Sequence, residues 1–330
     1  MKNITYLLLT LALCAGCSDS ENENENENAS SNSEASVEKG SAVVFNVDYG
    51  ATSDASVTSL GVELSPVFKS TLEISDYVGI SAINAGGEVS DLNTKYFCNG
   101  DGTTVATVIS NSICYPKSGT INAVAYTPYD LDYSYEGGLT LSIADQSDLE
   151  AIDFACSDLA KDLSDNGESV NMTLNHLLTA ILFKVEAGDG IEPESLDYVT
   201  FTIEGLNTQA NITFGEEVNY TFSKMSNIVM NTTDTPGYAK ALVFPEYITN
   251  STVYLRIKYD GGEIYSGLKQ LLGGGNSQLA SATIRSCTAT INRDGVTFTA
   301  DAKDGADGNT IIDWSEGEVA DDENGSAYEF

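Results

Sequence analysis

The hydrophobic residues of this chain fall into short runs rather than into long amphipathic stretches. From residue 41 onward, runs rich in β-branched and aromatic residues are separated by clusters of Gly, Asn, Asp and Ser, which is the pattern of strands joined by turns. The predicted strands are 42–47, 77–83, 103–109, 120–126, 138–143, 198–203, 253–259, 282–291 and 296–300. The sequence therefore predicts an all-β protein, with one short helical piece within 145–162.

The longest apolar segment, 170–185, changes the phase of its alternation partway along. Apolar residues take even positions in its first half and odd positions in its second half. A period-two pattern that shifts by one residue is typical of a bulge or a bend. We interpret the segment as one long bent strand, with a helix at 176–183 as the alternative.

The strands and turns together indicate two antiparallel β-sandwiches in tandem. About 290 residues is long for one sandwich and natural for two. The polar run 161–169 is the predicted boundary, which gives an N-terminal β-sandwich at 41–165 and a C-terminal β-sandwich with an acidic tail at 166–330. The bent strand would open the second domain. Further on, Asp260-Gly261-Gly262 lies between two strand-like runs and predicts a hairpin.

The N-terminus has the pattern of an export signal. A short basic start precedes an apolar run at 4–13, about half the ~20 residues that a membrane-spanning helix needs. The run leads into Ala15-Gly16-Cys17, which resembles the lipobox of bacterial lipoproteins. By that resemblance, residues 1–16 are a lipoprotein signal peptide and Cys17 carries the lipid, as palmitate, which anchors the chain in the outer membrane. The alternative is an ordinary signal peptide cut nearby.

Residues 17–40 are predicted to be an acidic, disordered tether. Residues 18–40 hold seven acidic residues and one lysine, and they lack an apolar period. An acidic stretch directly after a lipidated cysteine also resembles the surface-export signal of Bacteroides-type lipoproteins. The alternative is a simple spacer.

The charge of the chain excludes several kinds of partner. It contains 49 acidic residues against 15 basic ones, for a net charge of −34. Such a surface repels phosphate backbones and anionic lipid headgroups, so we expect neither nucleic-acid binding nor electrostatic binding to membranes. The single histidine leaves little material for histidine-based catalysis or a multi-histidine metal site.

An ordered set of short motifs resembles the fimbrillin family, the type V pilins and pilin-like lipoproteins of Bacteroides-type bacteria. The motifs are Tyr115-Pro116, an Ala-Tyr-x-Pro-Tyr strand end at 125–129, Ser-Asp-Leu at 157–159, His176-Leu177, Val-Phe-Pro at 243–245 and a late tryptophan, Trp314. Each motif is short, and their order together with the lipobox carries the resemblance, which covers roughly residues 41–316.

The resemblance implies two transthyretin-like β-sandwich domains and assembly with other fimbrial subunits by strand addition. In that family a protease removes an N-terminal strand, and a neighbouring subunit's C-terminal strand fills the groove. The segment 42–47 is the candidate for the removed strand here. Main-chain hydrogen bonds and alternate buried side chains stabilise such an added strand.

The sequence departs from the pattern of the polymerising members. Those known for arginine-specific processing carry an arginine after the first strand, whereas the first arginine here is Arg256. Lys69 is the first basic residue beyond the candidate strand. Either another protease acts, or the chain is never cut and serves as an anchor, a tip or a free surface protein. The acidic tail 317–330 is a poor donor strand, and 310–314 is a better one.

Candidate chemical groups are few. The sequence favours a structural, hydrogen-bonded role for His176 over one as a catalytic base or a ligand. Export permits disulfides, and Cys98–Cys114 is the most plausible pair among Cys98, Cys114, Cys156 and Cys287, although buried thiols are favoured. The Asp/Gly-rich stretch 301–309 suits an oxygen-ligand calcium loop but lacks the EF-hand spacing, which favours a solvated turn.

Four tyrosines lie close together at Tyr126, Tyr129, Tyr133 and Tyr135. Exposed rings beside carboxylates could bind a sugar or a protein, whereas packing in the core is the favoured alternative. The sequence as a whole predicts a non-enzymatic fimbrial component, structural or adhesive, with no cofactor or metal. It would serve as an anchor or tip rather than as a shaft subunit and would contact host or bacterial surface ligands. The alternative function is a surface glycan-binding lipoprotein.

Overall fold

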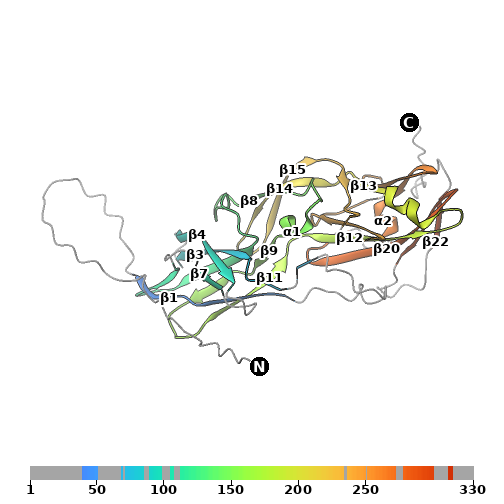
Figure 1. Ribbon diagram of the computed structural model, residues 1–330. Helices are drawn as coiled ribbons and strands as arrows, with labels where there is room; N and C mark the ends of the chain where they lie inside the picture. Colours follow the sequence, from blue (N-terminus) through green and yellow to red (C-terminus); the bar gives the residue numbers. More distant parts are fainter. Residues whose placement is uncertain are drawn as a thin grey trace, which may run out of the picture.

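The computed structural model in Figure 1 is an elongated molecule built almost entirely of strands. It describes residues 39–50, 68–69, 71–84, 89–98, 105–107, 112–233, 236–249, 251–272, 278–300 and 311–314. The strands are β1 Lys39–Ala42, β2 Phe45–Tyr49, β3 Tyr77–Asn84, β4 Val89–Cys98, β5 Val105–Thr107, β6 Cys114–Pro116, β7 Ile121–Thr127, β8 Leu139–Ser142, β9 Ala155–Ser157, β10 Ala160–Leu163, β11 Val170–His176, β12 Thr179–Ala187, β13 Thr200–Glu204, β14 Asn207–Thr213, β15 Asn219–Met225, β16 Ile228–Val229, β17 Tyr238–Val243, β18 Tyr254–Tyr259, β19 Gly262–Gly267, β20 Thr283–Asn292, β21 Gly295–Ala300 and β22 Ile311–Trp314. The helices are α1 Leu149–Ile152, the 3₁₀ helix η2 Pro193–Tyr198 and α2 Leu268–Leu271.

The predicted all-β class is confirmed, and every predicted strand overlaps an observed one. The predicted hairpin is β18–β19, paired from Tyr254–Gly267 to Tyr259–Gly262. The predicted helical piece is α1, whose first turn is capped by the Asp148 carboxylate as it accepts the Ala151 N–H at 3.1 Å. Within the described ranges, no helix is long and apolar enough to cross a bilayer.

The N-terminal sheet has the order β2-β11-β9-β7-β3-β4-β5, with β10 also pairing with β7. One buried cluster lies against it and includes Phe45 and Val47 of β2, Ile80 of β3 and Leu174 of β11. β1 and β6 form a separate two-stranded sheet, and Tyr115 of β6 belongs to the same cluster. Alternation places these side chains on one face because successive residues of a strand point to opposite sides.

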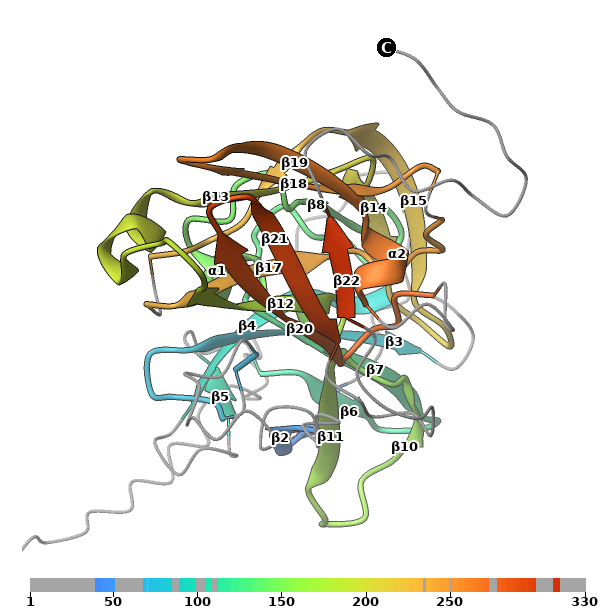
Figure 2. The same ribbon diagram turned by 90° about the vertical axis from the view of Figure 1, so that its right-hand side faces the viewer.

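The C-terminal part is a sandwich of two sheets, ordered β17-β12-β20-β21-β22 and β16-β13-β18-β19. Figure 2 shows the sheet that contains β18 and β19 lying over the sheet that contains β20 and β21. Phe183 of β12 and Phe298 of β21 belong to one sheet, and Phe201 of β13 belongs to the other. The ring centroid of Phe183 is 5.8 Å from that of Phe201 and 6.3 Å from that of Phe298, so aromatic rings fill the space between the sheets.

The segment 170–185 forms two strands, β11 and β12, with a break where the phase changes, rather than the one long bent strand of the second domain that the sequence predicts. β11 buries every second residue from Val170 to His176, and β12 begins at Thr179 with a run of buried residues. The alternative helix does not form. β11 pairs with β2 and β9 in the N-terminal sheet, and β12 pairs with β17 and β20 in the C-terminal one. The chain therefore passes from one sheet to the next within two residues, between His176 and Thr179.

A further, three-stranded sheet links the two parts of the molecule. β8 pairs with β14, and β14 pairs with β15, as Figure 1 also shows. One continuous buried cluster includes Leu139 and Leu141 of β8 together with Phe183 of β12. The division at residue 165/166 and the transthyretin-like comparison stay predictions.

Most strand pairs are antiparallel, as predicted, but two of the pairs among the described strands are parallel. β2 runs parallel to β11, and β12 runs parallel to β20. Parallel neighbours require a crossover connection rather than a tight turn, so both pairs join segments that are far apart in the sequence.

Candidate functional site

The segment that contains β1 and β2 lies between β6 on one side and β11 on the other. We call the position that this segment occupies the β2 seat. Phe45 to Tyr49 align in parallel with Val170 to Leu174 of β11. The Val170 N–H donates to the Val44 carbonyl at 2.8 Å, and the Gly50 N–H donates to the Leu174 carbonyl at 2.7 Å. On the other side, β1 pairs with β6, and the Val43 N–H donates to the Ile113 carbonyl at 2.8 Å.

The side chains of this segment alternate between the core and solvent. Val43, Phe45 and Val47 are buried, whereas Val44 is 52% exposed. The Phe45 ring meets the Tyr96 ring edge to face, with centroids 5.7 Å apart. The predicted strand at 42–47 is thus an edge element that is held both by backbone hydrogen bonds and by side chains buried in the core.

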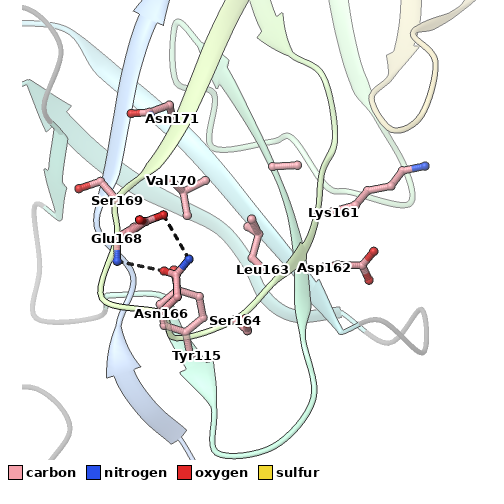
Figure 3. A pocket seen from close by; sticks show the side chains of 11 residues that line it. Tyr115, Lys161, Asp162, Leu163, Ser164, Asn166, Glu168, Ser169, Val170 and Asn171 are labelled. Carbon is pink, nitrogen blue, oxygen red and sulfur yellow. Dashed lines mark hydrogen bonds between the residues drawn. The ribbon is translucent and has the colours of Figure 1, made fainter.

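A cavity of about 430 Å³ lies beside this seat, at the turn between β10 and β11 (Figure 3). Figure 3 shows Asn166 and Glu168 facing each other across the turn, where the Glu168 N–H donates to Asn166 Oδ1 at 3.0 Å. Tyr115 and Val170 also line the cavity. Burial, with a contribution from the Asp165 carboxylate, raises the pKa of Tyr115. The cavity reaches the end of β11 at which pairing with β2 begins.

His176 lies at the opposite end of β11 and is 2% exposed. Its Nδ1 is 2.8 Å from Asp153 Oδ1, while Asp153 Oδ2 accepts the Lys69 N–H at 2.9 Å. The rings of Tyr49 and Phe68 stack on it, with centroids 5.0 Å and 4.5 Å away. The side chain is therefore buried and hydrogen-bonded, as the favoured structural interpretation predicts.

The sequence singled out His176 but did not reveal which residues contact it. Tyr49, Phe68 and Asp153 come from three separate segments, and no local spacing connects them. The pairing of β11 with β2 and β9 brings them together, because it aligns Tyr49 with Leu174 and Ala155 with His176.

The cysteines Cys98, Cys114, Cys156 and Cys287 are all buried thiols, so the Cys98–Cys114 disulfide that the sequence left open does not form. Burial, together with the Asp158 carboxylate, raises the pKa of the Cys156 thiol to about 12. Such a thiol is a poor nucleophile, because the thiolate is the reactive form.

The four tyrosines do not form an exposed platform. Tyr126 and Tyr133 are buried, and the Tyr126 hydroxyl donates to Asn93 Oδ1 at 2.7 Å. Tyr129 and Tyr135 are partly buried against the same cluster, and Lys95 Nζ lies 5.0 Å from the Tyr129 ring centroid and 3.6 Å from that of Tyr77. The lysine therefore already occupies the aromatic face on which a sugar would stack.

Several predicted sites fall outside the described residues. They are Cys17 with its signal peptide and tether, the stretch 301–309, and the acidic tail 317–330. Part of the candidate donor strand 310–314 is described as β22, which pairs with β21 at the edge of the C-terminal sheet. Among the described residues, no three His, Cys, Asp or Glu side chains converge on a point that could hold a metal ion.

The fold is that of an all-β protein with packed sheets, in which the N-terminal strand β2 lies at the edge of its sheet. A candidate cell adhesion protein of Bacteroides uniformis superimposes with a TM-score of 0.62 at 17% identity, over 83% of this chain and 99% of that one. A second candidate cell adhesion protein, of Bacteroides ovatus, gives a TM-score of 0.54 at 17% identity, over 85% of this chain and 98% of that one. No curated protein matched the sequence.

A family model described as fimbrillin-like matches residues 65–314, which is most of the chain. The protein therefore belongs to the fimbrillin-like family and is a fimbrial component of the cell surface, as the ordered motifs predict.

Proposed function

We propose that this chain is a lipid-anchored, non-enzymatic fimbrial component that joins other subunits by strand addition, as an anchor or tip rather than as a shaft subunit. The observation that carries the proposal is the seat of the β1–β2 segment. Backbone hydrogen bonds hold the segment on both sides, and its inward side chains complete a core. A seat of this kind accepts an extended chain with alternating apolar residues.

The anchor or tip role is supported by the surroundings of Lys69. Its Nζ pairs with Asp76 Oδ1 at 2.7 Å and its N–H donates to Asp153, so a protease must break both contacts to cut there. Burial of carboxylates would also disfavour donation of the acidic tail, since charge is costly to bury. Both features fit a subunit whose first strand is not removed by cleavage and leaves the seat only when another strand displaces it.

The non-enzymatic part of the proposal is supported by the environment of His176. Rings cover both of its faces, and Asp153 occupies its Nδ1. A catalytic base must reach the proton that it abstracts, and this ring reaches only other core residues.

Mass spectrometry of the protein shed from cells tests the role. An N-terminus at Cys17 in every molecule is the expected result for an anchor or a tip. A new N-terminus between residues 48 and 75 would instead show strand removal and support a polymerising subunit.

Palmitate labelling tests the anchor. Wild-type protein should incorporate label and Cys17→Ala should not, with Cys287→Ala as a matched control that keeps the label. Incorporation into Cys17→Ala would contradict lipidation at this residue.

Co-purification tests the fimbrial role itself. A tagged full-length chain should be present in fimbriae sheared from the cell surface and should be accessible to antibody on intact cells. Its absence from both would contradict the proposal.

A further inference from the structure

The β2 strand ends in an aromatic residue that rests on the buried histidine. The Tyr49 ring is nearly parallel to the His176 ring, with 12° between their planes and 5.0 Å between their centroids. Phe68 stacks on His176 at 4.5 Å and 22°. Tyr49 thus lies at the end of the β2 seat, where its ring stacks on the flat His176 ring.

Asp153 fixes the orientation of the His176 ring. Its Oδ1 contacts His176 Nδ1, and its Oδ2 accepts the backbone N–H of Lys69. His176 Nε2 is buried and has no hydrogen-bond partner. One edge of the ring is therefore pinned, and its flat face serves as the contact surface for Tyr49.

The outer side of this position opens to a cavity of about 360 Å³ that Tyr49, Lys69, Asp76, Thr127 and Glu150 help to line. Burial, followed by the carboxylates of Asp153 and Asp76, raises the pKa of Tyr49, so the ring carries a neutral hydroxyl. Beside the Tyr49 ring there is therefore open space lined by polar and charged side chains.

The next residue of the segment, Gly50, lies close to β11. A Cβ placed on Gly50 would lie 2.8 Å from Asn175 Oδ1 and 3.3 Å from the Leu174 carbonyl oxygen. The Gly50 N–H bonds to that same carbonyl, so the backbone cannot move away without losing the bond. The shorter of the two contacts is with the end of an exposed side chain, so the close approach to β11 favours glycine after the aromatic residue without strictly requiring it.

From these contacts we infer that the end of the β2 seat is a selective subsite, which takes an aromatic residue, with a preference for glycine after it, from any extended chain that fills the seat. The occupant is a peptide strand with apolar residues at alternate positions and this aromatic–glycine pair at its C-terminal end. The inference rests on the proposed strand addition and deepens it, because it states which strands the seat accepts. His176 acts as a specificity-determining residue and Asp153 as a positioning residue.

The test uses the full chain with a specific protease site introduced between Gly50 and Phe68. The cut protein is incubated in mild urea with an excess of a labelled peptide that carries residues 40–50, and bound label is measured by fluorescence anisotropy. The peptide variants are Tyr49→Phe, Tyr49→Trp, Tyr49→Leu, Tyr49→Ala, Gly50→Ala and, as a matched control at an exposed position, Val44→Ala.

We expect the Phe and Trp peptides to bind within about threefold of the native peptide, and the Leu and Ala peptides roughly 10- to 100-fold more weakly. The Gly50→Ala peptide should bind about two- to fivefold more weakly, because the added methyl group displaces the exposed Asn175 side chain and crowds the Leu174 carbonyl oxygen. The Val44→Ala peptide should bind as the native one does.

Equal binding of the Leu and native peptides overturns aromatic selectivity, and equal binding of the Gly50→Ala peptide overturns the glycine preference. Failure of every peptide to bind overturns the inference as a whole. These results are independent of native processing, because the cut is introduced; the N-terminus found on cells tests the proposed function separately. As a second measurement, the His176→Leu protein should bind the native and the Tyr49→Leu peptides with more similar affinities than the wild-type protein does. The results of the peptide series with wild-type protein remain valid even if this variant does not fold.

Discussion

The two parallel strand pairs of this protein serve different purposes. β12 and β20 pair through nine residues at the centre of a sheet, with β17 and β21 on their outer sides. β2 and β11 pair through five residues, and β2 lies at the edge of its sheet. The first pair is integral to its core, whereas the second depends on a short segment at the edge of its sheet. Under the proposed strand addition, the first ladder is permanent and the second is exchangeable, because the second is shorter and lies at an edge.

The largest expected effect is on the central pair. Phe183→Ala removes a fully buried ring between two sheets and should lower the free energy of unfolding by about 3–5 kcal/mol. Urea denaturation at pH 7 measures it, with Ile74→Ala, at a position that is 70% exposed, as the control that should change stability by less than about 0.5 kcal/mol. A loss no larger than that of the control would contradict the integral role of β12.

A smaller and more local effect is expected at the edge pair. Phe45→Ala also removes a buried ring, and we expect a loss of about 3 kcal/mol, at the low end for such substitutions. Hydrogen exchange should show lost protection in β1, β2 and β11, with β12 and β20 unchanged. Val44→Ala is the matched control. Equal loss of protection in β20 would mean that the edge segment is as integral as the central pair.

The contact between Lys69 and Asp76 bears on whether the chain is cut after the β1–β2 segment. Asp76→Asn weakens the hold on Lys69, so cleavage of the folded protein after Lys69 by a lysine-specific protease should become about two- to fivefold faster. Glu216→Gln, which removes the exposed partner of Lys161, should leave that rate unchanged. Timed digestion followed by mass spectrometry gives both rates, and identical rates in wild type and Asp76→Asn would exclude this protective role.

The smallest expected effect concerns a hydrogen bond between β15, in the three-stranded sheet, and the bend between β11 and β12. The Tyr220 hydroxyl donates to the Leu177 carbonyl at 2.8 Å, so Tyr220→Phe should cost about 1 kcal/mol at pH 7. Burial raises the pKa of Tyr220 from 10.0 to about 12. Its contribution is complete below pH 10, where the unfolded chain also keeps the proton, and is lost as pH rises through the folded value.

Tyr220→Phe should therefore reduce the fall in stability between pH 10 and about 12. Urea denaturation at several pH values measures the slope. Tyr198→Phe, at a position that is 78% exposed, is the control and should leave the profile unchanged. An unaltered alkaline slope in Tyr220→Phe would show that another group dominates it.

Local patterns made much of this architecture predictable. Alternation and turn residues located the strands, and the change of phase within 170–185 located the bend between β11 and β12. The glycines after Asp260 located a hairpin. These features depend on residues that are close in sequence, which is why the chain reveals them directly.

Long-range pairing was not predictable in the same way. Nothing local aligns Phe45 with Val170 or Leu141 with Ala210, since the register of distant strands depends on the whole fold. The setting of His176 has the same origin. The sequence favoured a structural histidine, but Tyr49 and Phe68 reach it only once β2 lies beside β11.

The pairing of β8 with β14 has a mechanical consequence. Strands from the two parts of the molecule share one ladder, and side chains from both complete one continuous buried cluster. Bending one part against the other must expose apolar surface to water, which is costly. A protein held at the cell surface experiences drag from the surrounding fluid, and we expect this one to respond as a stiff rod rather than as two hinged modules.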